Sequence, residues 1–317
     1  MPQKVRVLYV GGTGRSGSTI VANALGALDE VISVGEVRFL WERGIIQNRL
    51  CSCGEPFAGC PFWRDVLQAA YGGDVPDADR VHRRLTERTQ LRSLPAMLRS
   101  SSAAAPTSVP SDLAEVLTPL YRAIATVSGK RVVVDSSKLP TYAAVLAGCP
   151  QLSVEVLHLV RDPRAAAFSW QRKKALTDRP AQAFMEQRGV AKSALLWTAW
   201  NGALEWAWRE APGYVRLRYE TFAAHPAGTL DQLALSFALT GAERVADEHG
   251  RLRLPANHTV AGNPSRMSAG PTVVRLDNEW AGAMSRRDLA IVGAITAPLL
   301  GHYGYPRAIV RQDPNSR

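Results

Sequence analysis

The sequence predicts an α/β fold with a mostly parallel sheet. Short β-rich runs alternate with helical stretches along the chain, which is the pattern of a parallel sheet with right-handed crossovers. The first of these runs leads into a glycine-rich turn and then a helix. The chain has 317 residues, of which 46% are hydrophobic, so it can bury a sizeable core.

Five runs are expected to be strands, and two helices follow directly from the pattern around them. The strands are expected at residues 4–10, 31–34, 131–134, 153–160 and 215–219. One helix should cover roughly residues 18–28, and an Ala-rich helix should begin at Pro163, because proline suits the first turn of a helix.

The pattern changes between about residues 50 and 128. Residues 80–99 are typical of one basic amphipathic helix, and residues 100–111 form a Ser/Ala/Pro linker. We expect a helical insertion over the sheet edge, within a single domain spanning 1–317, and we expect it to act as a lid on the substrate side. Residues 255–276 look irregular, and a loop of that length is often functional.

The charge balance favours an anionic partner. The formal net charge is +10, and only six of the 38 basic residues are lysines. Aromatic and basic residues are not interleaved, and zinc-finger spacing is absent from the sequence, so we expect no nucleic-acid partner. An apolar run of the ~20 residues needed to span a membrane and a secretory signal are both missing from the sequence. We therefore expect a cytoplasmic protein; its oligomeric state is not indicated.

The turn between residues 11 and 19, GGTGRSGST, predicts an anion site. Backbone N–H groups converge at such a turn, and the dipole of the following helix favours negative charge. A tight turn without a ligand would explain the glycines. It would not explain why Ser16, Ser18 and Thr19 all offer hydroxyl groups there.

Three ligands remain open for this turn. A G-x-G-x-x-G pattern followed 19 residues later by Glu36 is typical of a dinucleotide site. The spacing also fits a P-loop, although Ser18 stands where the phosphate-binding lysine belongs; Asp135 would then be a magnesium ligand of a kinase. Finally, Arg15 places a cation where it can meet the oxygens of a 5′-phosphosulfate.

A second anion site is suggested by residues 160–170. Arg161 ends a strand, and Ser169 follows it by eight residues. An Arg161–Asp162 salt bridge and an ordinary helical serine are the alternative, since arginine binds phosphate and carboxylate equally well.

Together, the turn and the Arg-x7-Ser pattern resemble the sulfotransferases that use 3′-phosphoadenosine-5′-phosphosulfate (PAPS). The resemblance covers residues 4–45 and 130–300, and implies a P-loop-like parallel sheet of about five strands flanked by helices. It implies that the turn binds the 5′-phosphosulfate and that Arg161 and Ser169 bind the 3′-phosphate. It further implies that Tyr219 lies beside that phosphate. Residues 262–266 resemble the loop that closes over the nucleotide in bacterial members. The donor-binding residues carried over are Gly14, Arg15, Ser16, Gly17, Ser18, Thr19, Arg161, Ser169, Tyr219, Asn263, Ser265 and Arg266.

The resemblance also implies a reaction without metal, in which a sulfuryl group passes to a hydroxyl of a sugar or small natural product. The usual histidine base is not evident, because Lys138 precedes Leu139-Pro140 at the corresponding place. We therefore expect Glu36 to be the base, with a pKa raised by burial, and Lys138 and Arg15 to stabilise the transferring group. A magnesium-dependent kinase and a non-catalytic nucleotide-binding protein are the alternatives.

Four cysteines stand at positions 51, 53, 60 and 149. The first three would bind zinc if Cys149 or His82 came near, or would form a disulfide in an oxidising compartment. The spacing lacks a paired C-x-x-C, so we expect no metal. The six histidines do not cluster in the sequence, and His258, before the expected closing loop, is the one of interest.

Overall fold

The computed structural model describes residues 4–100, 109–179, 183–247 and 249–307. Its centre is a sheet of five parallel strands in the order β2-β3-β1-β4-β7, as the sequence led us to expect. The strands are β1 (Val5–Gly12), β2 (Val31–Ser33), β3 (Val132–Lys138), β4 (Leu152–Val160) and β7 (Tyr214–Arg218).

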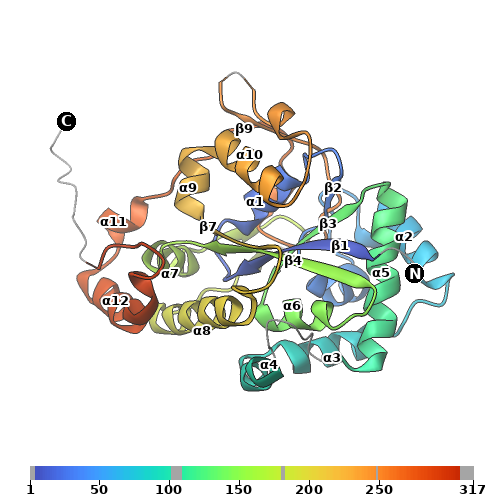
Figure 1. Ribbon diagram of the computed structural model, residues 1–317, viewed down its shortest axis with the longest axis horizontal. Helices are drawn as coiled ribbons and strands as arrows, with labels where there is room; N and C mark the ends of the chain where they lie inside the picture. The colour runs from blue at the N-terminus through green and yellow to red at the C-terminus, as the bar shows by residue number, and fades with distance from the viewer. Residues whose placement is uncertain (1–3, 101–108, 180–182, 248, 308–317) are drawn as a thin grey trace.

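Helices cover both faces of the sheet (Figure 1). Side chains of β1 alternate between two hydrophobic clusters, because successive residues of a strand point to opposite faces. Val7 and Tyr9 belong to one cluster, and Leu8 and Val10 to the other. All four are fully buried, which explains why the run is apolar without a polar face.

One face carries α1, α9 and α10, and the other carries α5, α6 and α8. Helices α7, α11 and α12 pack at one end of the molecule, beside α8. The helices are α1 (Ser18–Leu25), α2 (Pro61–Tyr71), α3 (Ala78–Thr89), α4 (Leu94–Ser100), α5 (Ser111–Ser128), α6 (Pro140–Ala147), α7 (Pro163–Gln171), α8 (Val190–Trp208), α9 (Tyr219–Ala224), α10 (Pro226–Ser236), α11 (Glu279–Ala283) and α12 (Arg286–Leu300).

The insertion departs from the expected pattern in its helix boundaries. The basic stretch 80–99 is not one helix, because Gln90 adopts an extended conformation that ends α3, and α4 begins at Leu94. Most of the expected linker, residues 101–108, lies outside the described residues. Trp63 of α2 and Leu117 of α5 join the same hydrophobic cluster as Val7 of β1, so the insertion shares the core of the sheet.

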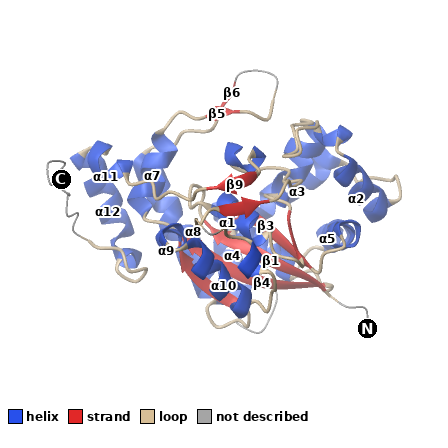
Figure 2. Ribbon diagram, turned by 90° about the horizontal axis from the view of Figure 1, so that it is seen from above, coloured by secondary structure: helices blue, strands red, loops and turns tan. Residues whose placement is uncertain are grey.

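Two small antiparallel pairs accompany the main sheet (Figure 2). Strands β5 (Ala175–Leu176) and β6 (Ala183–Phe184) form one, and β8 (Leu252–Leu254) and β9 (Gly270–Thr272) form the other. The expected irregular stretch 255–276 therefore contains β9 and a short 3-10 turn, Pro264–Met267, with loops between them.

Candidate active site

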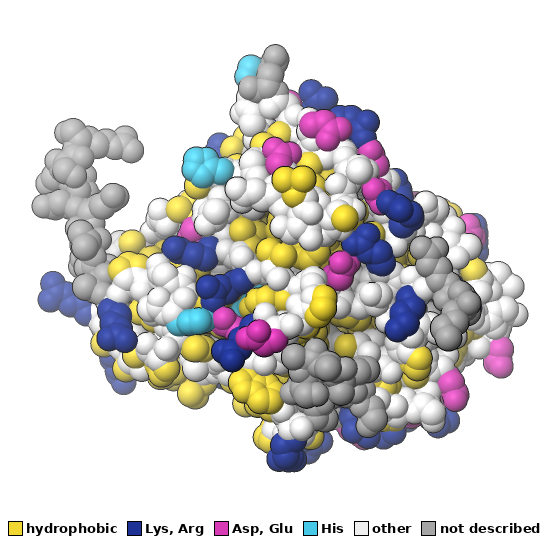
Figure 3. Space-filling model, viewed as in Figure 1, with side chains coloured by type: hydrophobic (Ala, Val, Ile, Leu, Met, Phe, Trp, Pro, Cys, Tyr) yellow, Lys and Arg dark blue, Asp and Glu magenta, His cyan; other side chains and the backbone are white. Residues whose placement is uncertain are grey.

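A cavity of about 690 Å³ opens at the carboxyl ends of the parallel strands. From β1 the chain passes to β2 and β3 on one side of it, and then to β4 on its other side. Ligands of open α/β sheets bind where the strand order changes direction in this way. Eleven lysine or arginine side chains line the cavity against three carboxylates. On the face drawn in Figure 3, by contrast, charges of both signs are interspersed. The positive charge is thus concentrated in the cavity, which suits a polyanionic ligand.

The turn after β1 needs its glycines for two different reasons. Gly17 has a φ of +87°, and a Cβ there would lie 2.2 Å from the Tyr219 ring. A Cβ on Gly14 would collide with Trp170, at 2.5 Å. The turn therefore packs against two aromatic rings, one from α9 and one from α7, and its residues line the cavity.

Arg15 is held in a strained backbone conformation at the same turn. Its φ is +68°, which is unfavourable for a residue with a side chain and is typical of functional positions. The guanidinium lies 4.8 Å from the centre of the Trp170 ring, while Nε and Nη2 are buried without a hydrogen-bond partner. Burial and the neighbouring Arg188 lower the pKa of Arg15. These unpartnered donors are available to an anion.

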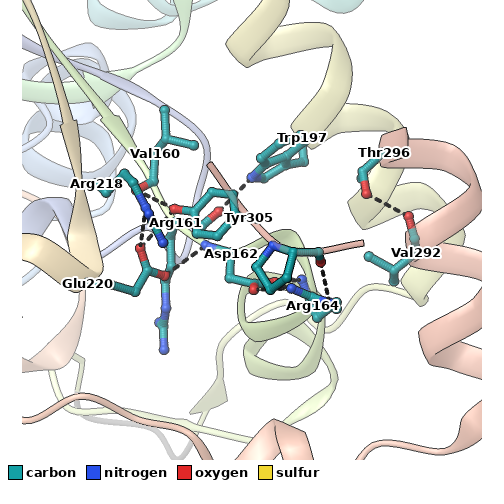
Figure 4. Close-up of polar contacts among 11 residues, drawn as sticks. Val160, Arg161, Asp162, Arg164, Trp197, Arg218, Glu220, Val292, Thr296 and Tyr305 are labelled. Atoms are coloured by element: carbon teal, nitrogen blue, oxygen red, sulfur yellow. Dashed lines mark hydrogen bonds and ion pairs between the residues drawn. The ribbon is translucent and has the colours of Figure 1, made fainter. Parts of the chain in front are cut away.

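Arg161 is positioned by a hydrogen-bond network around its backbone (Figure 4). Its carbonyl accepts a hydrogen bond from Trp197 Nε1 (2.9 Å), and the next amide, of Asp162, donates to Glu220 Oε1 (2.9 Å). Tyr305 donates in turn to Glu220 Oε2 (2.8 Å). The guanidinium extends away from this network into the cavity, where Nη1 donates to the Arg15 carbonyl (3.1 Å) and Nε has no partner.

The suggested Arg161–Asp162 pair does not form. The Asp162 carboxylate instead binds Arg164, at 2.6 Å, and accepts from the Arg164 amide, so it caps α7. Arg161 is 4.0 Å from Asp277 across the cavity, a long contact that leaves it open to a ligand. Ser169, two turns into α7, also lines the cavity.

Glu36 and Lys138 form a buried ion pair with Oε1 and Nζ 2.5 Å apart. Glu36 follows β2 and Lys138 ends β3, and both line the cavity. Burial raises the pKa of Glu36, but Lys138, Arg43 and Arg38 outweigh it, so its pKa lies below the usual 4.5. The expected rise toward neutrality does not occur. Lys138 has a φ of +73°, so a second strained cationic residue faces the same space.

Asp135, on β3, is fully buried and does not line the cavity. Its carboxylate accepts hydrogen bonds from Tyr121 Oη, from Ser137 Oγ (2.6 Å) and from the Ser137 amide (2.8 Å). Burial raises the pKa of Asp135 to about 6. Because both oxygens are hydrogen-bonded and Asp135 does not line the cavity, it offers no ligand to a magnesium ion there, which removes the structural basis of the kinase alternative.

Most residues predicted for the site meet at the cavity, but two do not. The lining includes Glu36, Lys138, Gly14, Arg15, Gly17, Ser18, Thr19, Arg161, Ser169, Tyr219, Asn263 and Ser265. The Ser16 hydroxyl is buried beneath the turn without a partner. Arg266 is also buried and points away from the cavity: it donates to the carbonyls of Thr259 (2.7 Å) and Leu50 (2.8 Å), so it holds the loop in place and does not face a ligand.

Several cationic residues at the site were not predicted. Arg38 and Arg43 lie in the irregular helix after Glu36, and Arg172, Lys174 and Arg188 border the cavity around the β5–β6 pair. The run of basic residues after Gln171 signals Arg172 and Lys174. It gives no signal for Arg38 and Arg43, because local patterns do not show which way an irregular segment turns. The described residues between 50 and 128 contribute nothing to the lining, so the insertion does not form the cavity wall as a lid would.

Comparisons with known proteins find one family profile and several solved structures that are similar to this chain. The sequence profile of the sulfotransferase family matches residues 8–240. A sulfotransferase domain from the curacin biosynthetic pathway is 15% identical, with a TM-score of 0.51 over 96% of this chain and 99% of that one. A sulfotransferase domain from the Synechococcus PCC 7002 olefin synthase is 16% identical, with a TM-score of 0.49 over 96% and 97% of the two chains. A Mycobacterium avium sulfotransferase is 12% identical, with a TM-score of 0.47 over 96% and 78%.

A search of curated proteins finds no significant match. Across the described part of the chain, no helix is both long and apolar enough to cross a bilayer. The family profile spans well over half of the sequence, and the curacin-pathway domain is similar to this chain in its fold. On these grounds, the chain belongs to the sulfotransferase family.

Proposed function

We propose that the enzyme transfers a sulfuryl group from PAPS to a hydroxyl of a sugar or a small natural product, leaving adenosine 3′,5′-bisphosphate. The observation that carries this proposal is the cation excess of the cavity, with guanidinium nitrogens of Arg15 and Arg161 buried and without partners. A buried unpartnered donor is costly, and an anionic ligand would satisfy it.

In this proposal the turn from Gly14 to Thr19 holds the 5′-phosphosulfate, with Arg15 on its oxygens. Arg161 and Ser169 bind the 3′-phosphate, and Tyr219 lies between the two sites, 5.0 Å from the Arg161 guanidinium. Asn263 and Ser265 contribute from the loop that borders the cavity, where the Asn263 amide donates to Thr19 Oγ1 (3.3 Å). Arg15 and Arg161 thus offer two guanidinium groups to a ligand that carries two phosphates.

In the chemical step the acceptor oxygen attacks sulfur while the bond between sulfur and the phosphate-bridging oxygen breaks. Glu36, whose lowered pKa keeps it ionised at neutral pH, takes the acceptor proton. Lys138 donates to the departing bridging oxygen and balances the negative charge that develops there. The two side chains already form an ion pair at the cavity, so neither has to move there from another part of the protein.

The rest of the cavity supports an acceptor with an apolar or ring-shaped face. Phe39, Trp170 and Trp200 line it beside the cations. Aromatic rings stack on sugars and phenols alike, so both acceptor classes belong to the proposal. The four cysteines form no disulfide with one another, which suits a reducing compartment, and we propose the cytoplasm as the place of action.

Labelled donors test the proposal directly. The protein is incubated with PAPS labelled in the sulfate, or with ATP labelled in the γ-phosphate, and with a panel of sugar and phenolic acceptors. We expect label transfer from PAPS alone, at a rate unaffected by added magnesium. Transfer from ATP that depends on magnesium would establish the kinase alternative instead.

A further inference from the structure

Three cysteines and a histidine converge at a second place, apart from the cavity. These are Cys51, Cys53, Cys60 and His258, whose sulfur and ring-nitrogen atoms all lie within 4.8 Å of one another. None of the four lines the cavity. The sequence pointed to Cys149 or His82 as the fourth member, but neither belongs to the cluster. Cys149 instead lies in the hydrophobic core just after α6, and its Sγ contacts the Val145 carbonyl of that helix.

The four contact distances within this cluster are close to those between ligands of one ion. Cys60 Sγ lies 3.7 Å from Cys51 Sγ and 3.7 Å from Cys53 Sγ. His258 Nδ1 lies 3.3 Å from Cys60 Sγ and 3.8 Å from Cys51 Sγ. A tetrahedral zinc ion with bonds of about 2.3 Å to sulfur and about 2.0 Å to nitrogen separates its ligands by roughly 3.5–3.8 Å. A disulfide would need about 2.05 Å.

The chain builds the cluster from two loops that hydrogen bonds hold together. The Cys51 amide donates to the Glu55 carbonyl (2.8 Å) and the Gly54 amide to the Cys51 carbonyl (2.9 Å), which closes a tight turn around the first two sulfurs. Ser52 Oγ donates to the Asn257 carbonyl (2.8 Å) and accepts from the Thr259 amide (2.7 Å).

The histidine is fixed separately by two aromatic residues from the start of α2. Trp63, fully buried, donates through Nε1 to the His258 carbonyl (2.8 Å). Phe62 stacks on the His258 ring, with centroids 4.8 Å apart. Trp63 thus fixes the backbone of His258 and Phe62 packs on its ring, with Nδ1 beside the sulfurs of Cys60 and Cys51.

We propose that Cys51, Cys53, Cys60 and His258 bind one structural Zn²⁺ ion. Soft thiolate donors with one imidazole in a tetrahedral set select zinc, and four protein ligands leave no position for water or substrate. The ion is therefore not a participant in sulfuryl transfer. The proposal is independent of the donor assigned above.

The position of the cluster indicates what the ion does. It cross-links the turn at residues 51–60 to the loop that starts at His258. Two residues on, the Val260 amide donates to the Val34 carbonyl (3.1 Å), and the Glu36 amide donates to the Ala261 carbonyl (3.2 Å). Asn263, on the same loop, lines the cavity. The ion thus anchors the loop that borders the cavity next to Glu36.

Metal content of the full chain, purified from zinc-supplemented growth without chelator, is the first test. We expect one zinc per chain in the wild type and in the control Cys149→Ser, whose sulfur is buried outside the cluster. Cys53→Ser removes the exposed ligand and is the variant best placed to remain folded. We expect it, and His258→Gln, to lose zinc to a chromophoric chelator at least tenfold more readily than the control.

Cobalt substitution reads the coordination itself. Co²⁺-loaded wild type and Cys149→Ser should show the visible absorption of tetrahedral thiolate-bound cobalt, and Cys53→Ser should shift or lose it. Wild-type protein that carries neither zinc nor this absorption, or that yields a disulfide between two of the three cysteines in peptide mapping, overturns the proposal. So does a Cys53→Ser variant that holds metal as tightly as Cys149→Ser. Circular dichroism confirms that each variant compared is folded.

Discussion

Two carboxylates beside strand β3 have opposite surroundings. Glu36 faces the cavity and is paired with Lys138, which lowers its pKa, while Asp135 faces the core and is saturated by Tyr121 and Ser137, with a raised pKa. Both are buried and both lie near the turn after β1. The difference is the direction in which each side chain leaves the backbone. Burial alone therefore does not mark a functional acid; an opening toward a ligand does.

The largest effect expected from this contrast is on turnover. Glu36→Gln keeps the size of the side chain but removes the proton acceptor, so kcat should fall by roughly 10²–10⁴-fold. Affinity for adenosine 3′,5′-bisphosphate should barely change. The measurement is the initial rate of label transfer from PAPS, together with calorimetric binding of the bisphosphate.

Asp135→Asn is the matched control for that variant, because it alters an equally buried carboxylate outside the cavity. We expect its kcat to stay within about threefold of the wild type. If Glu36→Gln keeps full turnover but binds the bisphosphate weakly, Glu36 is a ribose ligand and the assignment of the base is wrong.

A second effect concerns Arg161, whose buried Nε has no hydrogen-bond partner. Adenosine 3′,5′-bisphosphate should bind more tightly than the 5′-monophosphate, since charge-assisted hydrogen bonds contribute about 1.5–3 kcal/mol each. Arg161→Ala should lower that preference by about 10–100-fold. Arg6→Ala is the control, because Arg6 is paired with Glu155 away from the cavity (2.9 Å) and should leave the preference intact. Equal affinity of the wild type for both nucleotides would refute the 3′-phosphate site.

The stability of the protein should record the raised pKa of Asp135. The folded state takes up a proton near pH 6, whereas an unfolded aspartate does so near 3.8. Between these values the folded state binds more protons, so stability falls as pH rises, by roughly 3 kcal/mol in all. Denaturant unfolding at pH 4.5 and pH 7 should show about 2 kcal/mol of this loss for the wild type, because pH 4.5 already lies within the titration range. Asp135→Asn, which cannot titrate, should lack it; equal slopes in the two proteins would contradict the assignment.

The smallest expected effect is on the pH dependence of turnover. Because the pKa of Glu36 lies below 4.5, the carboxylate stays ionised, and kcat should change less than about twofold between pH 8 and pH 5.5. A histidine base, with an ordinary pKa near 6.5, would produce a clear fall on the acid side of this range. Such a fall in the wild type, still present in the residual activity of Glu36→Gln, would identify a base other than the one proposed.

Local sequence was enough for the parts of the site that belong to regular elements. The alternation of apolar strands with helices predicted the sheet. The glycines of GGTGRSGST predicted the turn, because glycine adopts the positive φ angles that a tight turn requires. Arg161, Ser169 and Tyr219 follow strands, and all strands of a parallel sheet end at one edge, so their meeting at the cavity follows from topology.

Other features depend on contacts between distant segments, which only the tertiary structure decides. Arg266 looked like a ligand-binding residue, yet it turns inward because the carbonyls of Leu50 and Thr259 are there to accept from it. The pKa of Glu36 falls because the end of another strand brings Lys138 against it.

The cysteines illustrate the same division. The sequence by itself determined that three thiols lie within ten residues, but it could not supply a fourth ligand. His258 is almost two hundred residues away, at a separation of 198 from Cys60. It joins the cysteines because Trp63 and Ser52 hold its loop in place. Residue types and local turns are set by neighbours in the chain. The direction of a side chain is set by whichever partner the folded core brings within reach.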